Sequence, residues 1–192
     1  MATYKDSGVD IDAGDRAVEL MKASIARASR PEVMGGIGGF AGLFDASALK
    51  AMKQPLLATS TDGVGTKTEI ARQLGKYDTI GEDLVAMVVD DLVVCGAEPL
   101  FMTDYIAVGK VIPERIADIV AGIARGCQKS GTALIGGETA EHPGLLAEDE
   151  FDIAGAATGV VDADKQLGAE RVKSGDVIIA MPASGFHANG YS

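Results

Sequence analysis

Apolar residues recur along this chain in two patterns, helical stripes and short strand-like runs. Between Asp15 and Arg30 they come at spacings of three and four, and Pro31 ends the run, which predicts a helix. Two further helices are predicted, one from about Gly81 to Val94 and one that begins at Pro113 and is closed by Gly131. Strand-like apolar runs occupy residues 55–61, 100–108, 132–137, 151–161 and 177–181.

The order of these elements indicates a fold class. Strands and helices interleave, which predicts a mixed α/β (α+β) domain with helices on one face of a mixed sheet. Residues 161–176 have the composition of a polar connection between domains. We therefore expect a first domain at residues 1–169 and the opening of a second at residues 170–192, which holds the strand 177–181, a glycine-bearing turn and the start of a helix.

Composition and charge exclude several classes of function. The formal net charge of −11 argues against a nucleic-acid partner, because such a surface repels polyanions. Cys95 and Cys127 form no CxxC pair, so neither a disulfide scaffold nor a zinc site is indicated. The first residues lack the apolar core of a signal peptide, and Asp90 and Asp91 interrupt the most apolar stretch. We expect a cytoplasmic protein with no membrane partner.

One glycine-bearing segment carries candidate chemistry, the turn TDGVGTK at residues 61–67. Asp62 offers a hard oxygen to Mg²⁺, Lys67 offers a point charge to phosphate, and the two glycines allow backbone N–H groups to face a ligand. The pattern is not a P-loop, and the G-x-G-x-x-A pattern at residues 36–41 follows a helix where a dinucleotide site requires a strand. A plain hairpin turn accounts for Asp-Gly equally well, so both interpretations stay open.

Acidic residues mark two more candidate positions. Asp83 and Asp90 are seven residues apart and share one face of the predicted helix, with Asp91 one position round. Their neighbours are apolar, which favours metal ligation slightly over a solvated face, because buried acids need a partner. Glu138, directly after the apolar run TALI, is predicted to face a ligand from the end of a strand or to lie exposed in a turn.

The last residues offer two side-chain donors, His187 and Asn189, in a stretch of small residues before a predicted helix start. Such a stretch can bind an anion, although a lone histidine in a loop is more often only a surface residue. His142 has no second histidine nearby, which argues against zinc.

Together these segments resemble one family, the phosphoribosylformylglycinamidine cyclo-ligases (AIR synthetases), in order and spacing. The resemblance rests on YKDSGVDI at 4–11, RPEVMGGIGGF at 30–40, TDGVGTK at 61–67, DLVAMVVDDLVVCGAEPLF at 83–101, GGETAE at 136–141 and HANGYS at 187–192. It implies an ATP-dependent ligase of purine biosynthesis that converts formylglycinamidine ribonucleotide and ATP to aminoimidazole ribonucleotide, ADP and phosphate. It also implies a homodimer in which the sheets of two subunits close into a barrel.

The resemblance further implies roles for individual residues. Those implied in catalysis are Asp62, Lys67 and His187. Mg²⁺ ligands would be Asp62, Asp91, Asp83 and Glu138. ATP contacts would come from Gly63, Gly65, Thr66, Lys67, Gly36, Gly38, Gly39, Lys5, Lys22 and Glu138, with residues 35–39 as a cover over the nucleotide. Substrate contacts would come from His187 and Asn189.

Three positions depart from the pattern that the family implies. Asp90 stands in place of asparagine, His142 in place of methionine, and Ala188 in place of serine. Two alternatives remain open beside the cyclo-ligase. The first is another enzyme of the same ATP-binding superfamily, such as selenophosphate synthetase or thiamine-monophosphate kinase. The second is a fragment that dimerises and binds nucleotide without turnover.

Overall fold

The computed structural model describes residues 8–36, 39 and 41–192. In chain order the elements are α1 (Ile11–Arg27), β1 (Val33–Met34), β2 (Leu43–Phe44), the 3₁₀ helix η2 (Ser47–Ala51), β3 (Pro55–Gly63), α2 (Lys67–Leu74), α3 (Ile80–Val94), β4 (Glu98–Val108), α4 (Pro113–Ser130), β5 (Ala133–Glu141), β6 (Phe151–Asp162), and the 3₁₀ helices η3 (Ala163–Lys165) and η4 (Ala169–Arg171).

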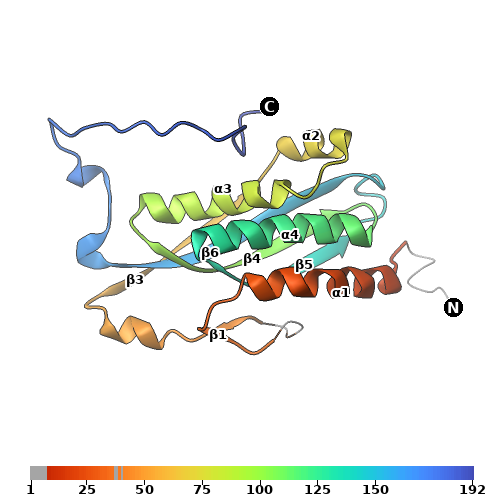
Figure 1. The fold of residues 1–192 in the computed structure, drawn as a ribbon, viewed down its shortest axis with the longest axis horizontal. Helices are drawn as coiled ribbons and strands as arrows, with labels where there is room; N and C mark the ends of the chain where they lie inside the picture. Colours follow the sequence, from red (N-terminus) through yellow and green to blue (C-terminus); the bar gives the residue numbers. More distant parts are fainter. Residues whose placement is uncertain (1–7, 37–38, 40) are drawn as a thin grey trace.

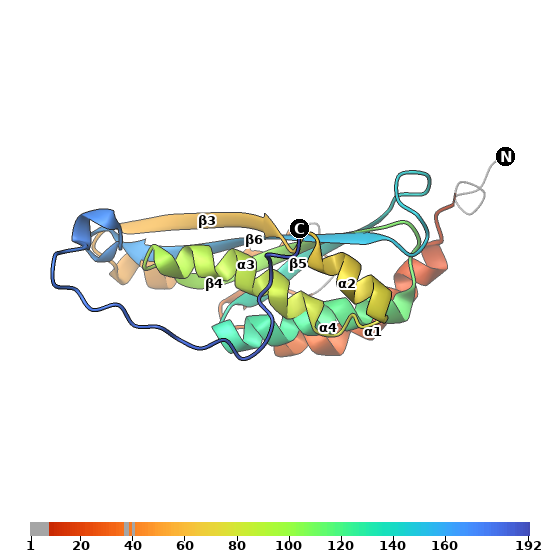
Figure 2. The same cartoon turned by 90° about the horizontal axis from the view of Figure 1, so that it is seen from above.

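The long strands form one four-stranded sheet in the order β3-β6-β4-β5. β4 and β5 run parallel, whereas β6 is antiparallel to both of its neighbours. Helices α1, α3 and α4 lie on one face of this sheet, and the described elements leave its other face open (Figures 1 and 2). The predicted fold class, a mixed sheet with helices on one face, is confirmed.

Two glycines set the distance between the central helices. A Cβ atom on Gly81 of α3 would overlap the backbone of α4 at Ile119 and Ile123, and a Cβ atom on Gly122 of α4 would lie 2.8 Å from the carbonyl oxygen of Asp78. The helices therefore cross in direct backbone contact, which only residues without a side chain permit. The core between the helices and the sheet is filled by buried aliphatic side chains, among them Leu84, Leu92, Met102, Ile106, Ile116 and Ile123.

Several predicted boundaries were wrong, and each has a local cause. The first helix starts at Ile11 because Asp10 caps it, with its side chain accepting the N–H of Ala13 at 3.1 Å, and it ends at Arg27. The apolar run 132–137 is part of a longer strand that continues to Glu141. Sequence reasoning missed α2 and the short β1–β2 hairpin. The helices at 80–94 and 113–130 are confirmed, and Gly131 ends the latter with φ 69°.

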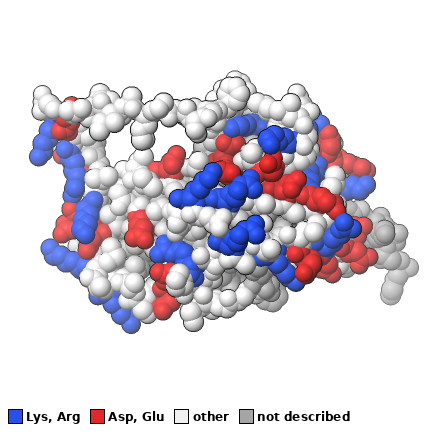
Figure 3. Space-filling view, viewed as in Figure 1, with Lys and Arg blue, Asp and Glu red and all other residues white. Residues whose placement is uncertain are grey.

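The strand predicted at residues 177–181 is absent, and no helix begins in residues 183–192. Val177, Ile178 and Ile179 are 82–95% exposed, because among the described residues no strand lies beside them. This segment belongs to an arm that runs past α3 and returns to α2 (Figure 1), with gaps between the arm and the rest of the molecule (Figure 3). None of the described helices is long and apolar enough to cross a bilayer.

Candidate functional site

The TDGVGTK turn joins β3 to α2. β3 extends through Asp62 and Gly63, where the Asp62 Oδ1 atom accepts the N–H of Gly63 at 2.8 Å. Gly65 then takes a positive φ of 69°, and α2 begins at Lys67. The segment is therefore a strand-to-helix connection, and the plain hairpin interpretation was wrong.

Lys67 does not face an open surface. Its Nζ atom donates to the Asp83 Oδ1 atom at 3.0 Å, to the carbonyl oxygen of His187 at 2.9 Å and to that of Phe186 at 3.3 Å. The Lys67 and Asp83 side chains are only 18% and 17% exposed. Burial raises the pKa of Asp83 above its ordinary value, and the hydrogen bond from Lys67 works against that shift. In this structure Lys67 fastens the end of the chain to the TDGVGTK turn.

The acidic face of α3 lies along β3. The Ser60 hydroxyl group donates to the Asp91 Oδ2 atom at 3.0 Å, and Asp62 is two residues further along the same face of the strand. Asp90 and Asp91 are exposed, so the cost of burying them, which favoured metal ligation, does not arise. Asp62 and Asp91 nevertheless stand on adjoining elements near the turn.

Charged and glycine residues alternate in one row across the sheet. Asp62 of β3 is paired with Gly155 of β6, Gly155 with Asp104 of β4, and Asp104 with Gly137 of β5. All four positions face the helices, since Ser60, Met102 and Ile106 on the same alternation are buried. The row connects the TDGVGTK turn on one edge strand with the GGETAE segment on the other.

Glu138 and Glu141 of that segment differ in role. Glu138 is exposed in the middle of β5, so its prediction as a carboxylate at a strand end was wrong. The Glu141 carboxylate accepts the backbone N–H of Val111 at 2.6 Å and that of Asp10 at 3.0 Å. Glu141 thus joins the start of α1 to the loop before α4. Within the described part of the chain, no three acidic, histidine or cysteine side chains converge as a ready-made metal site.

A cavity of about 630 Å³ opens between α1, the loop after β1, and β5. Its wall is mostly aliphatic or glycine, and the carboxyl group of Asp104 is its one acid besides Glu138. Burial raises the pKa of Asp104 to about 7. Sequence reasoning missed this residue, although a single acid in the apolar run LFMTDYIAV was the available signal.

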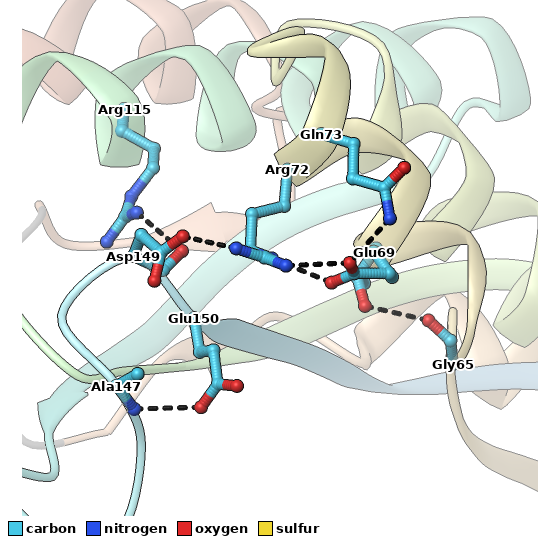
Figure 4. A network of polar contacts seen from close by, with 9 residues as sticks. Gly65, Glu69, Arg72, Gln73, Arg115, Ala147, Asp149 and Glu150 are labelled. Atoms are coloured by element: carbon cyan, nitrogen blue, oxygen red, sulfur yellow. Dashed lines mark hydrogen bonds and ion pairs between the residues drawn. The ribbon is translucent and has the colours of Figure 1, made fainter.

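Two arginines hold α2 against the loop that follows β5 (Figure 4). Arg72 of α2 forms ion pairs with Asp149 and with Glu69, the latter at 2.7 Å. Arg115 of α4, 4% exposed, donates to the carbonyl oxygens of Asp149 at 3.0 Å and Lys110 at 2.9 Å. Hydrogen bonds from Arg72 and Gln73 lower the pKa of Glu69 to about 2. The network fixes α2, and so the position of Lys67, relative to α4.

The family model described as "AIR synthase related protein, N-terminal domain" matches residues 44–161, more than half of the chain. The chain belongs to this AIR synthase related family. The resemblance found in the sequence is therefore confirmed. The match contains the TDGVGTK turn, the acidic face of α3 and the GGETAE segment.

Three curated relatives of this chain are named phosphoribosylformylglycinamidine cyclo-ligase. The chain is 57% identical to that of Desulfitobacterium hafniense over 190 residues, which is 99% of this chain and 56% of the relative. It is 57% identical to that of Geobacillus kaustophilus (98% and 54%) and 55% identical to that of Acetivibrio thermocellus (100% and 56%). The chain thus spans just over half the length of these relatives.

Solved structures share the fold at low identity. E. coli HypE, a hydrogenase maturation protein, matches with a TM-score of 0.62 and 21% identity over 82% of this chain and 46% of HypE. Thiamine-monophosphate kinase from Stenotrophomonas maltophilia K279a matches with a TM-score of 0.55 and 21% identity (79% and 43%). HypE in complex with ATP matches with a TM-score of 0.55 and 17% identity (88% and 46%). These matches support the fold of the AIR synthase related domain.

The remaining predicted residues of this AIR synthase related chain are placed as follows. His187 is exposed, and its carbonyl oxygen accepts from Lys67 and from the Tyr191 hydroxyl group at 2.9 Å. The Asn189 side chain lies 3.5 Å from the Met87 sulfur atom, beside α3. Lys22 is exposed and pairs with Glu19. Gly36 and Gly39 line the cavity, whereas Lys5 and Gly38 lie outside the described residues.

Proposed function

We propose that this chain is the N-terminal part of an ATP-dependent cyclo-ligase that converts formylglycinamidine ribonucleotide and ATP to aminoimidazole ribonucleotide, ADP and phosphate. One observation carries the proposal: relatives named phosphoribosylformylglycinamidine cyclo-ligase align with 98–100% of the chain at 55–57% identity. The TDGVGTK, GGETAE and HANGYS segments also carry side chains suited to a phosphate-transferring reaction.

The reaction requires an amide oxygen to leave, and an amide oxygen is a poor leaving group. ATP phosphorylates the formamide oxygen, and the amidine nitrogen then attacks the same carbon and expels phosphate. Such transfer depends on positioning and charge neutralisation. Gly65 and Thr66 would offer backbone N–H groups to the phosphates, whereas the N–H of Gly63 donates to Asp62. His187 and Asn189, which Lys67 holds beside the turn, would face the substrate.

Mg²⁺ would screen the phosphate charges. Mg²⁺ bound to a nucleotide usually takes one or two carboxylates and completes its shell with phosphate oxygens and water. Asp62 and Asp91 fit that donor set, because they lie near the turn on adjoining elements without a cationic partner among the described residues. Asp83 is a weaker ligand, since Lys67 already neutralises it.

A second subunit would pair with this one through the open sheet face. Asp62 lies on one edge strand and Glu138 on the other, three inter-strand spacings or roughly 14 Å apart. One ion cannot contact both within a single chain. The open sheet face, which carries Leu57 (68% exposed) and Tyr105 (41%), supports a homodimer in which the sheets pair, on the face opposite to Asp62.

The domain division is part of the same proposal. Residues 1–169 would form the ATP-binding and dimerisation domain, and residues 170–192 would begin a second domain. The apolar side chains of residues 177–181 support this division, because they do not pack on the sheet or its helices. A further support for ATP is that one neighbour of this fold, HypE, has been solved in complex with ATP.

The test is an assay of this chain with Mg²⁺ and ATP for ADP release that depends on formylglycinamidine ribonucleotide. Substrate-dependent release supports the cyclo-ligase. No release, with Mg-ATP binding intact, supports a dimerising nucleotide-binding segment that needs further protein for turnover. Asp118→Asn, on the exposed side of α4, is a matched control for Asp62→Asn. Equal effects of the two variants would contradict the assigned site.

A further inference from the structure

α2 (Lys67–Leu74) has little apolar contact with the rest of the molecule. Ala71 is the one buried residue among its eight, whereas Ile70 and Leu74 are 39% and 71% exposed. An isolated helix of this length is not stable in water. The direction in which α2 leaves the TDGVGTK turn therefore depends on its polar contacts with neighbouring elements.

Glycines stand at both ends of α2. Gly65 and Gly75 have φ values of 69° and 61°, in the left-handed region that favours glycine. At both positions the place of a Cβ atom has no described atom within 4 Å, chain neighbours aside. Neither turn is braced on that side, so the turns alone do not fix the direction of the helix between them.

Arg72 joins the last turn of α2 to the loop that follows β5 (Figure 4). Its Nε and Nη2 atoms donate to the Glu69 carboxylate, both at 2.7 Å, and Glu69 also accepts from the side chain of Gln73 at 2.8 Å. These two partners lie on α2 itself and orient the guanidinium group. The remaining nitrogen, Nη1, forms an ion pair with Asp149, which lies outside the helix.

The position of Asp149 is set by the core. Its carbonyl oxygen accepts from Arg115 of α4 at 3.0 Å. Arg115 is only 4% exposed, and its Cζ atom lies 5.8 Å from the ring centroid of Tyr77 and 5.9 Å from that of Phe151. The acid that Arg72 contacts is therefore fixed relative to the core helix α4.

We propose that Arg72 is a positioning residue for phosphate transfer, which acts through its ion pair with Asp149. A helix carries a displacement along its axis, and residue 72 lies five positions, or about 7.5 Å, from residue 67. A shift there moves the Lys67 amine and the N–H groups of Gly65 and Thr66. The inference rests on the proposed function, which assigns those groups to the phosphates. A misplacement of about 1 Å with a distant cause can lower the rate about 100-fold.

The ion pair between Arg72 and Asp149 contributes little to stability. The Asp149 side chain is 61% exposed, and exposed pairs add little to the free energy of unfolding. Without this pair, α2 keeps the contact between Lys67 and Asp83 in its first turn and can pivot about it. A purely structural role would lower Tm, whereas a positioning role lowers phosphate binding and kcat with Tm nearly unchanged.

The first experiment uses Mg²⁺ with inorganic tripolyphosphate, which tests the turn without the proposed reaction. The isotope-labelled chain is titrated while the amide resonances of Gly65 and Thr66 are followed by NMR. We expect saturable shifts in wild type and binding at least about tenfold weaker in Arg72→Met and in Asp149→Ala. The double variant should bind no more weakly than either single variant, because both remove one pair. Lys76→Met, which breaks an ion pair outside this network, is the control and should bind as wild type does.

Rescue and turnover separate positioning from a structural role. Arg72→Lys keeps a cation that can reach Asp149, so it should recover most of the affinity lost in Arg72→Met. With Mg-ATP and formylglycinamidine ribonucleotide, Arg72→Met should lower kcat for ADP release at least about tenfold, while KM for the ribonucleotide stays within about twofold. Tm should fall by less than about 3 °C in Arg72→Met and in Asp149→Ala.

Equal tripolyphosphate binding by wild type and Arg72→Met, or none by wild type, overturns the inference. A larger fall of Tm in both Arg72→Met and Asp149→Ala indicates a structural role and overturns it as well. If tripolyphosphate binding requires Arg72 but wild type releases no ADP with the ribonucleotide, the positioning role stands and the cyclo-ligase activity of this chain fails. If wild type and Arg72→Met release ADP equally well, the proposed function stands and the positioning role is overturned.

Discussion

Asp62 and Asp104 lie in the same cross-strand row of the sheet, separated by Gly155. Two inter-strand spacings place their Cα atoms roughly 10 Å apart, on the face that the helices cover. Asp62 adjoins the TDGVGTK turn, and Asp104 adjoins the cavity beneath α1. Gly155 itself adds no side chain between them, but Met102 Cε and Leu84 Cγ lie 3.0 and 3.5 Å from where its Cβ atom would be, so apolar side chains separate the two carboxyl groups.

Asp62→Ala should abolish use of Mg-ATP by the enzyme that contains this chain. Loss of a metal-ligating carboxylate is expected to lower turnover by about 100-fold or more. Mutation of a residue that only orients a metal ligand already lowers metal affinity or activity about 10–100-fold. The dimer should remain assembled, because Asp62 faces the helices and not the open sheet face. Turnover and size-exclusion chromatography measure the two effects. Unchanged turnover in this variant would remove Asp62 from the metal site.

Glu141→Ala should lower stability, whereas Glu138→Ala should lower turnover. The first leaves the N–H groups of Asp10 and Val111 without their acceptor and should lower the free energy of unfolding by about 1–3 kcal/mol. The second removes an exposed side chain and should change stability by less than about 0.5 kcal/mol while reducing turnover. Urea unfolding and ADP release measure the pair. A stability loss in Glu138→Ala as large as that in Glu141→Ala would refute the division of roles.

Lys67→Met should release the end of the chain. The substitution removes three hydrogen bonds and leaves Asp83 half-buried without its cation, which should cost about 1–3 kcal/mol of unfolding free energy. Amide hydrogen exchange should accelerate in residues 186–191. Lys76→Met is the control, because Lys76 and Asp78 form an ion pair that is about half exposed and contributes little. Unaltered exchange in residues 186–191 would contradict the fastening role.

Arg115→Met should destabilise the fold more than any surface arginine. The carbonyl oxygens of Lys110 and Asp149 lose a buried charged donor, with an expected loss of about 3 kcal/mol and a fall in Tm of roughly 6–12 °C. Arg16→Met, which breaks an exposed ion pair with Glu114, should lower Tm by less than about 3 °C. Thermal unfolding of both variants tests this, and similar Tm values would show that the buried contacts of Arg115 add no stability.

Asp104 should make stability depend on pH. Its pKa is about 7 in the folded chain and near 3.8 when unfolded, so the folded state binds more protons than the unfolded state between these values. Its contribution to the free energy of unfolding is therefore complete below about pH 4 and is lost as pH rises to about 7. Asp104→Asn should abolish that part of the slope. The measurement is urea unfolding of both proteins from pH 4 to pH 8, and parallel curves would contradict the assignment.

The sequence predicted the parts of the fold that depend on local periodicity. The helices around Val88 and Ile119 follow from apolar spacing alone, as do the positions of β3, β4 and β6. The end of β5 was not predicted from the sequence, because Gly136 and Gly137 interrupt the apolar pattern. The strand continues through them because β4 supplies their backbone partners. Residues 177–181 have strand composition, but a strand needs a neighbour, and composition does not supply one.

The candidate site was predictable in its motifs but not in its pairings. Asp62 and Lys67 stand out from the turn chemistry of TDGVGTK. That Lys67 pairs with Asp83 and holds the backbone at His187 depends on contacts between segments far apart in the chain. Asp104 escaped notice because strand alternation places it on the helix-covered face, where an acid is unexpected, and only the folded chain shows the cavity beside it.

The overlap between Gly137 and Asp104 has a consequence for how this fold can vary. Any side chain at position 137 takes the volume that the carboxyl group at position 104 now fills. A substitution at 137 can therefore persist only together with a smaller or redirected residue at 104, so the two positions should change as a pair. Chains of this fold with alanine or serine at 137 should lack aspartate at 104, and with it the acid that the cavity contains here.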